Sequence, residues 1–238
     1  MLSVENATVR FGGLTALRNV TFSMAEREIL GLVGPNGAGK TTLFNAISGL
    51  VRTNGAGRIR FGTTDIGRLG LYRRARLGIG RTFQIPQPLH GLMVRENLVV
   101  AQRFGAGKVD EREIDQILDV MELSAVAGRD AATGLALQEL KRLEVAKALA
   151  TRPKLLLLDE VLAGLELQAK KAFMHKFKEL HALFDLSIIV IEHDIETISN
   201  LCPRVVVLDF GQVIAEGSPN EVFRNPEVVR SYMGAEDA

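Results

Sequence analysis

The sequence predicts an α/β fold with a mainly parallel sheet, because short apolar runs alternate with helical patterns along the chain. A continuous apolar run is typical of a strand that is buried on both faces. Such runs occur at residues 29–33, 155–158, 187–191 and 204–208. Helical patterns at residues 168–183 and 194–201 separate the later runs. We therefore expect parallel strands with helices on the faces of their sheet.

The first quarter of the chain adds shorter strands and one helix. Residues 2–11, 20–24 and 57–61 alternate or cluster β-forming side chains, as short strands do. From Lys40 the pattern TTLFNAISGL is typical of a helix that Gly49 closes. This helix directly follows the glycine-rich stretch after the apolar run ILGLV.

The middle of the chain has a different character. Helical patterns occur at residues 94–103, 110–123 and 138–150, and no strong strand candidate lies among them. Glycines mark the breaks, at Gly105, Gly107 and Gly128. We expect a single domain, residues 1–238. Its α/β core comprises residues 1–93 and 151–238, and a helical lobe of about residues 94–150 is inserted into it.

Composition excludes several classes of protein. With 238 residues, 47% of them hydrophobic, the chain can bury one full core. A formal charge of +1 does not suggest a nucleic-acid partner. The single Cys202 cannot form an internal disulfide and fits a reducing compartment. The start MLSVENATVRF lacks the features of a signal peptide, and no apolar stretch is long enough to span a bilayer.

The glycine-rich stretch GPNGAGKT matches a phosphate-binding loop, since it follows a buried strand and precedes a helix. Glycines let backbone N–H groups wrap a phosphate, and the helix start adds positive potential. Lys40 would contact the β- and γ-phosphates, and Thr41 would bind Mg²⁺. A turn that merely links strand and helix is the weaker alternative. The expected ATP-binding residues are Gly34, Pro35, Asn36, Gly37, Ala38, Gly39, Lys40, Thr41 and Thr42.

Two further strand ends carry polar residues. Asp159 and Glu160 follow the leucine run LLLL, and the carboxyl ends of such strands are where α/β sheets place ligands. We expect Asp159 to hold Mg²⁺ through water and Glu160 to polarise the attacking water. His193 follows the run at 187–191 and could contact a γ-phosphate. The alternative for Asp159 and Glu160 is a solvated acidic turn, and the alternative for His193 is a structural role. The other three histidines are interpreted as surface or packing residues.

In this order the motifs resemble the nucleotide-binding subunit of an ABC transporter over essentially the whole chain. The resemblance implies that Phe11 stacks on adenine and that Gln84 in RTFQIPQ joins Mg²⁺ to the transport machinery. The alternatives are a core aromatic for Phe11 and a surface residue for Gln84. His193 corresponds to the switch histidine, and residues 164–167 correspond to the D-loop. The signature segment corresponds to Leu135, Ala136, Leu137, Gln138 and Glu139.

Three segments outside the nucleotide site narrow the resemblance from ABC transporters in general to one subfamily. RFGGLTAL, RTFQIPQPLHGLMVRENL and GQVIAEGSPNEVFRNPEVVRSYMG are similar to ATPases of branched-chain amino acid importers. Relatives that import urea, other amino acids or small organic acids look alike, so an importer of one of those remains an alternative. The Pro-rich and apolar loop at residues 85–96 is expected to form part of a permease dock; the alternative is a loop packed on its own lobe.

The chain departs from the family in three motifs. The usual signature L-S-G-G-Q appears as LALQE, the proline after the catalytic glutamate is Val161, and the usual Asp or Asn of the D-loop is Glu166. Ala136 lacks the serine hydroxyl, and Gln138 adds bulk where backbone must approach a phosphate. The negative charge of Glu139 is favourable at the positive end of the helix dipole. It competes with the phosphate for that position. At a separation of ~4 Å and an effective dielectric of about 20, the repulsion between the Glu139 carboxylate and the phosphate is about 4 kcal/mol.

In this family the signature segment of one subunit serves the ATP that its partner holds. The resemblance therefore implies a heterodimer with two unequal sites, in which Glu160 of this chain does most of the hydrolysis. Alternatively, backbone N–H groups at the helix start still reach the phosphate. Further expected partners are two integral membrane permeases and, indirectly, a solute-binding protein, at the cytoplasmic face of the inner membrane. Two alternatives to an importer ATPase remain. One is a soluble ABC ATPase that moves no solute, and the other is a subunit that binds ATP without turnover.

Overall fold

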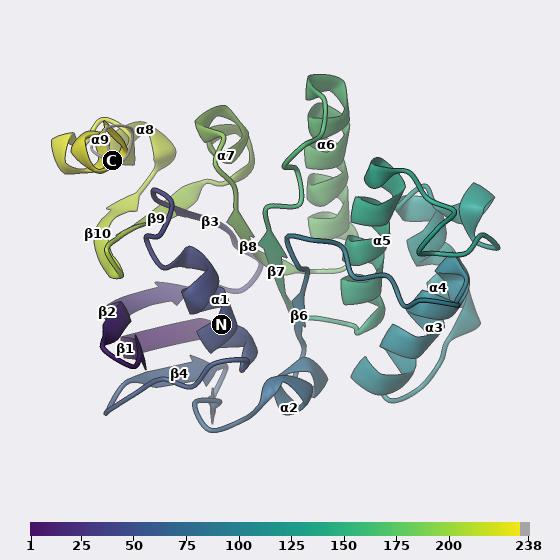
Figure 1. Cartoon of the computed structure of the whole chain (residues 1–238), viewed down its shortest axis with the longest axis horizontal. Coiled ribbons are helices and arrows are strands. Elements are labelled where there is room, and N and C mark those ends of the chain that lie inside the picture. Colours follow the sequence, from purple (N-terminus) through teal and green to yellow (C-terminus); the bar gives the residue numbers. More distant parts are fainter. Residues whose placement is uncertain (234–238) are drawn as a thin grey trace. The chain divides into compact units, whose positions relative to one another are not determined.

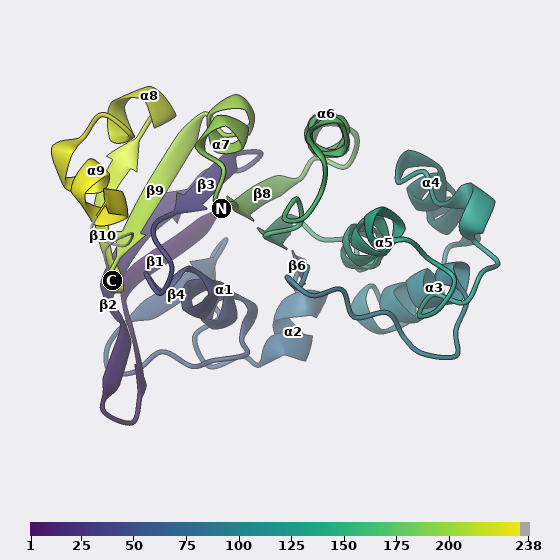
Figure 2. The same ribbon diagram turned by 45° about the horizontal axis from the view of Figure 1, so that its top comes forward.

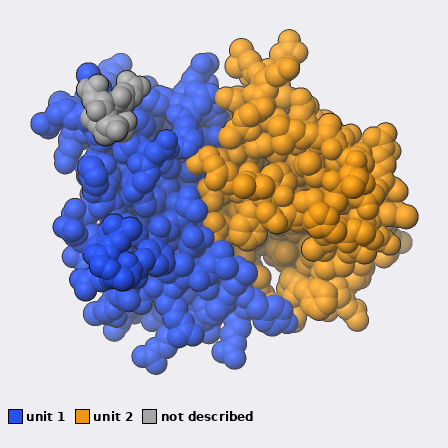
Figure 3. All heavy atoms as spheres, in the orientation of Figure 1, with its two compact units in different colours: residues 1–74, 187–238 blue, residues 75–186 orange. Residues whose placement is uncertain are grey.

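The computed structural model describes residues 1–233 (Figure 1). Its contacts divide the chain into two compact units, which Figure 3 shows in different colours. Unit 1 comprises residues 1–74 and 187–238, and unit 2 comprises residues 75–186.

Unit 1 contains two sets of paired strands. Its elements are β1 (Leu2–Phe11), β2 (Leu14–Met24), β3 (Ile29–Val33), α1 (Lys40–Ser48), β4 (Arg58–Phe61), β5 (Thr64–Asp65), most of α2 (Leu71–Arg76), β8 (Ser187–Ile191), α7 (Ile195–Leu201), β9 (Arg204–Asp209), β10 (Gln212–Gly217), α8 (Pro219–Val222) and α9 (Pro226–Met233). The strand β3 pairs in parallel with β8 and β9, and β10 pairs antiparallel with β9. The antiparallel sheet has the order β2-β1-β4-β5.

Unit 2 is mainly helical. Its elements are β6 (Ile79–Arg81), α3 (Val94–Gly105), α4 (Glu111–Val120), a 3₁₀ turn (Ser124–Val126), α5 (Leu137–Ala150), β7 (Leu155–Asp159) and α6 (Leu167–Leu183). The strands β6 and β7 pair in parallel. The helices α3, α4 and α5 pack against one another (Figure 2).

The predicted fold class is confirmed, with a mostly parallel set of strands and an antiparallel sheet. Every residue of β3, β7 and β8 is buried, as the continuous apolar runs predicted. The prediction for residues 20–24 was too short, because β2 begins at Leu14 and pairs with β1 across the turn at Gly12 and Gly13. The helices α3, α4 and α5 occur where helical patterns were seen. That residues 94–150 form a lobe inserted into the core stays a prediction.

Arg74 is a fully buried cation that forms hydrogen bonds with the C-terminal end of α1. Its guanidinium donates hydrogen bonds to the backbone oxygens of Ala46 (2.5 Å) and Ile47 (2.9 Å) in the last turn of that helix. It also donates to Leu69 O at 2.7 Å, and burial lowers the pKa of Arg74 to about 10. A helix leaves its last carbonyls without helical partners, so Arg74 satisfies two acceptors that would otherwise be buried and unpaired.

We expect Arg74→Met to lower the free energy of unfolding by about 3 kcal/mol, because Met fills space but donates no hydrogen bond. For a chain of this size that corresponds to a fall in melting temperature of about 6–12 °C. Thermal unfolding measures the change. Arg73→Met is the matched control, since Arg73 is exposed on the same helix. Equal melting temperatures for the two variants would contradict the role given to Arg74.

Candidate functional site

The phosphate loop (residues 34–41) requires glycine at two of its positions. Gly34 has a φ of 144°, and a Cβ there would lie 2.0 Å from the backbone oxygen of Leu208. Gly39 has a φ of 102°, and its Cβ would lie 2.8 Å from the backbone oxygen of Ala16. L side chains rarely adopt this backbone conformation, and neither position has room for one. Packing and backbone conformation therefore both require glycine at these two positions of the loop.

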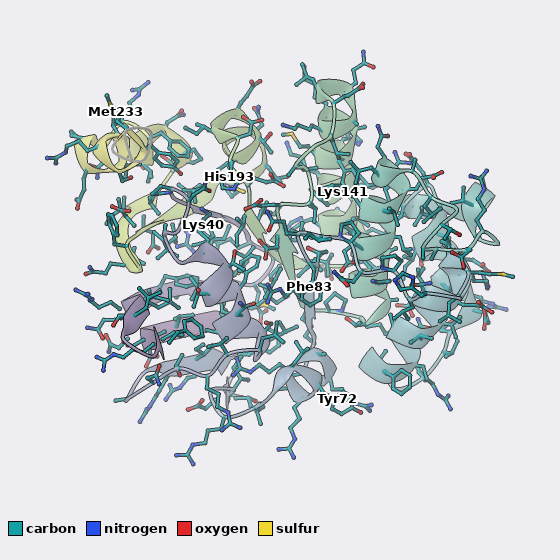
Figure 4. The ribbon with its side chains drawn as sticks, viewed as in Figure 1. Lys40, Tyr72, Phe83, Lys141, His193 and Met233 are labelled. Carbon is teal, nitrogen blue, oxygen red and sulfur yellow. The ribbon has the colours of Figure 1, made fainter. Side chains whose placement is uncertain are left out.

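Lys40 begins α1 and folds back over the loop (labelled in Figure 4). Its Nζ donates hydrogen bonds to the backbone oxygens of Gly34 (2.6 Å) and Pro35 (2.9 Å), and the side chain is buried. The residue before α1 is Gly39, which has no side chain to cap the first N–H groups of the helix. Thr41, the next residue, is exposed. This geometry suits an anion at the start of α1.

Two more predicted site residues belong to unit 1. His193 follows β8, which pairs in parallel with β3, so His193 and the phosphate loop leave the same edge of these paired strands. The His193 side chain is exposed, and Asp194 next to it caps α7 by accepting from Glu196 N at 3.1 Å. Phe11 ends β1 and is 49% exposed. Such exposure fits a stacking surface better than a core aromatic.

In unit 2 the Asp159 carboxylate forms a buried ion pair. Arg81 Nη2 lies 3.1 Å from Asp159 Oδ2, and the exposed fractions of the two side chains are 6% and 3%. Thr82 supports the same residue, because its Oγ1 accepts from Asp159 N at 3.1 Å and donates to Leu157 O at 3.3 Å. Burial lowers the pKa of Arg81, and the charge of Asp159 opposes this shift. The carboxylate is thus held in one place.

Glu160 is held in an unusual backbone conformation. Its φ is 49°, in the left-handed region that a residue with a side chain rarely adopts. The Glu160 backbone oxygen accepts from Lys141 Nζ (3.3 Å) and from Ala163 N (3.2 Å). Gln84 Nε2 donates to Glu160 Oε2 at 2.5 Å, so the structure brings these two predicted site residues together. Strain of this kind clusters at functional sites.

The signature segment forms the start of α5. Ala136 precedes the first turn, Leu137 begins the helix, and the Glu139 carboxylate accepts from Ala136 N at 2.8 Å. Glu139 therefore turns back onto its own helix start, where its charge suits the dipole. The segment borders a hollow of about 570 Å³, whose other lining residues include Gly164 and Glu166. The signature segment and the D-loop position thus share one surface of unit 2.

The sequence alone did not single out Arg81 and Thr82. Both lie at the end of β6, a strand of three residues that is too short to show periodicity. The only available signal was their position immediately before Phe83 and Gln84 in RTFQIPQ. Their contacts with Asp159 come from the parallel pairing of β6 and β7, in which Arg81 is opposite Leu157.

Comparison with known proteins identifies the family. Residues 17–163 match the family model of the ABC transporter, which covers more than half of the chain. The chain belongs to the ABC transporter family. It is an ABC-type ATPase, and the resemblance seen in its motifs is confirmed. A second family model, described as the branched-chain amino acid ATP-binding cassette transporter, matches residues 212–238, of which residues 234–238 lie outside the described part.

Relatives align with this ABC ATPase over nearly its full length. It is 35% identical to the high-affinity branched-chain amino acid transport ATP-binding protein BraF of Pseudomonas aeruginosa, with 98% of each chain covered. It is 34% identical to the probable branched-chain amino acid transport ATP-binding protein LivG of Archaeoglobus fulgidus, covering 100% of this chain and 97% of that one.

Solved structures agree with the fold. The ADP conformation of an ATP-binding cassette of an ABC transporter has a TM-score of 0.86 and 31% identity to this ABC ATPase, with 98% of each chain covered. CbiO1 from Clostridium perfringens, part of the ABC transporter complex CbiONQ, has a TM-score of 0.80 and 30% identity. No helix in residues 1–233 of the ABC ATPase is long and apolar enough to cross a membrane.

Proposed function

We propose that this ABC ATPase powers the import of branched-chain amino acids. The observation that carries the proposal is the near full-length similarity to BraF and to LivG, both described as branched-chain amino acid transport proteins. The match of residues 212–238 to the corresponding family model supports it. Urea and small organic acids are the alternative substrates.

The proposal includes partners and a location. We propose that the ABC ATPase works at the cytoplasmic face of the inner membrane with two permeases and a second ATPase subunit, and indirectly with a solute-binding protein. Co-expression with the candidate permeases should give a complex that survives purification. Vesicles containing it should take up leucine, isoleucine or valine when ATP is present. Uptake of urea or an organic acid in place of these would contradict the substrate, and soluble behaviour without permeases would contradict the transport role.

The hydrolysis machinery is proposed to comprise the site residues that the resemblance to the family implies. Phe11 stacks on adenine, the phosphate loop holds the phosphates through Lys40, and His193 contacts the γ-phosphate. Asp159, Gln84 and Thr41 are the residues proposed to hold Mg²⁺. Carboxylate, amide and hydroxyl oxygens are the donors that this ion prefers. When bound, Mg²⁺ neutralises charge that develops on the phosphates.

The loop at residues 85–96 is proposed to be part of the permease dock. Its last three residues are helical, because α3 begins at Val94. Three large apolar side chains on it are exposed, with fractions of 71% for Ile85, 39% for Leu89 and 49% for Met93. Apolar side chains gathered on one exposed segment are typical of an interaction site.

Charge substitution in this loop is expected to uncouple transport from hydrolysis. Leu89→Glu combined with Leu92→Glu should lower ATP-driven uptake by about 10-fold, because a buried charge disfavours docking, and should leave basal ATPase activity unchanged. Phe104→Glu is the matched control, since Phe104 is 64% exposed but lies at the end of α3. Retained transport in the double variant would mean that the permeases dock elsewhere.

The second ATPase subunit is proposed to differ from this one, giving two unequal sites. The support is the contrast between a complete phosphate loop and a signature segment in which Glu139 caps its own helix start. A carboxylate at that position competes with a γ-phosphate for the same N–H groups.

Inactivating one catalytic glutamate at a time in the assembled transporter tests this asymmetry. Loss of Glu160 should remove most of the ATPase activity, and loss of the corresponding glutamate in the other subunit should remove much less. Glu139→Gln, which removes the competing charge, should raise the activity of the weaker site. Equal losses from the two glutamate variants would mean that the altered signature segment still works.

A further inference from the structure

One face of α5 carries three charged side chains that point away from bulk solvent. Lys141, Glu144 and Lys147 are spaced by three residues, which puts them on neighbouring turns of the same face. Lys141 and Glu144 are buried, and the Lys147 side chain is 15% exposed. Charged side chains are seldom buried unless they have specific partners. Packing of the helix therefore does not by itself explain why these charged side chains lie on this face.

The partners of Glu144 lie on the Gln84 loop (residues 83–87). Glu144 Oε1 accepts a hydrogen bond from Phe83 N at 3.3 Å, and Glu144 Oε2 accepts one from Gln87 N at 3.1 Å. Lys147 Nζ lies 2.9 Å from Glu144 Oε2 and also donates to the backbone oxygen of Gln87. One carboxylate thus binds the loop on both sides of Gln84. Figure 4 labels Phe83 in this loop and Lys141 on α5.

The same helix also supports the residue that Gln84 contacts. Lys141 Nζ donates to the backbone oxygen of Glu160 at 3.3 Å, and Gln84 Nε2 donates to Glu160 Oε2 at 2.5 Å. A rigid helix therefore holds both members of the Gln84–Glu160 pair, through Glu144 on one side and Lys141 on the other. Gln84 is itself exposed, so buried packing does not fix its position.

We infer that Glu144 is a positioning residue that holds the Gln84 loop so that the Gln84 amide stays on Glu160. The inference rests on the proposed function, because it takes Glu160 as the group that polarises water and Gln84 as a residue that holds Mg²⁺ through its amide oxygen while its Nε2 contacts Glu160. Glu144 touches neither nucleotide nor water in this role. Its effect on hydrolysis passes through the loop.

The chemistry requires a carboxylate at this position. Both bonded atoms of the loop are N–H donors, so the side chain that receives them must present two acceptors, and an ionised carboxylate does so. Glutamine has nearly the same shape but offers one oxygen and one NH₂ group. In Glu144→Gln, one loop amide would face a donor and lose its partner. A partly buried donor that loses its acceptor is unfavourable, so that part of the loop should open.

The experiment combines Glu144→Gln with Gln84→Ala in the assembled transporter. Glu144→Gln should lower kcat for ATP by about 10-fold and change KM by less than about 2-fold, because ground-state binding is retained. If Glu144 acts through Gln84, the double variant should be no slower than Gln84→Ala alone. Amide hydrogen exchange of Glu144→Gln should be about 10-fold faster at Phe83 or Gln87, and unchanged in β3.

Glu179→Gln is the matched control. Glu179 pairs with Lys176 three residues away at 2.9 Å, as Glu144 does with Lys147, but it is exposed and forms no bond to the loop. Lys147→Met is a second variant, which leaves the Glu144 carboxylate in place and should give a smaller fall in kcat.

The outcomes separate this inference from the function on which it rests. If Gln84→Ala lowers kcat but Glu144→Gln does not, or if their effects multiply in the double variant, the inference is overturned and the role of Gln84 stands. If Gln84→Ala has no effect on kcat, the proposed role of Gln84 fails. In that case faster exchange at Gln87 in Glu144→Gln would still support Glu144 as the residue that holds the loop, and unchanged exchange would overturn it.

Discussion

Replacing Lys40 with Ala is expected to abolish measurable ATP binding by this ABC ATPase. The substitution removes the cation proposed to contact the β- and γ-phosphates. It also removes the two hydrogen bonds with which Lys40 Nζ holds the backbone oxygens of Gly34 and Pro35. Loss of one charge from a phosphate site in a partly desolvated setting is worth several kcal/mol, which corresponds to a fall in affinity of more than about 100-fold.

Equilibrium titration with a fluorescent ATP analogue measures this affinity. Thermal unfolding of the nucleotide-free protein checks that the loop change has not unfolded the chain. Lys40→Met separates the charge from the bulk of the side chain and should bind as poorly as Lys40→Ala. Lys171→Ala, at an exposed lysine on α6, is the control and should bind like the parent protein. A folded Lys40→Ala variant with unchanged affinity and turnover would refute the assignment of the phosphate loop.

Replacing Glu160 with Gln is expected to slow ATP hydrolysis by at least ~100-fold, the scale of losing a general base. Glutamine keeps the shape of the side chain, but its neutral amide cannot draw a proton from the attacking water. ATP binding should persist, because Lys40 and the phosphate loop are unchanged. The variant should therefore hold ATP for longer than the parent protein does.

Single-turnover measurements in the assembled transporter separate the chemical step from product release. Glu111→Gln is the control, because Glu111 is an exposed carboxylate in unit 2 that pairs with Arg95. Hydrolysis at the parental rate in Glu160→Gln would exclude Glu160 as the group that polarises water. Loss of ATP binding would instead point to a structural role for the strained backbone at this residue, whose φ is 49°.

The sequence by itself determined those parts of the protein whose signals are local. Buried strands such as β3 and β7 are continuous apolar runs, and the phosphate loop needs glycine where its backbone has a positive φ, as at Gly34 (144°) and Gly39 (102°). Each requirement acts within a few residues, so it leaves a pattern that can be recognised without a structure. The same holds for Glu139, which caps a helix start only three residues before it.

Only the tertiary structure decided which charged residues support these motifs. Arg81 meets Asp159, Glu144 meets the Gln84 loop and Arg74 meets the end of α1, although each pair is far apart along the chain. A lysine, arginine or glutamate is usually solvated, whether it lies on a helix or at the end of a short strand, so sequence gives it no distinctive pattern. It acquires a specific partner only when packing excludes water and brings a second polar group within hydrogen-bond distance. The energy of that contact depends on burial, which no short stretch of sequence encodes.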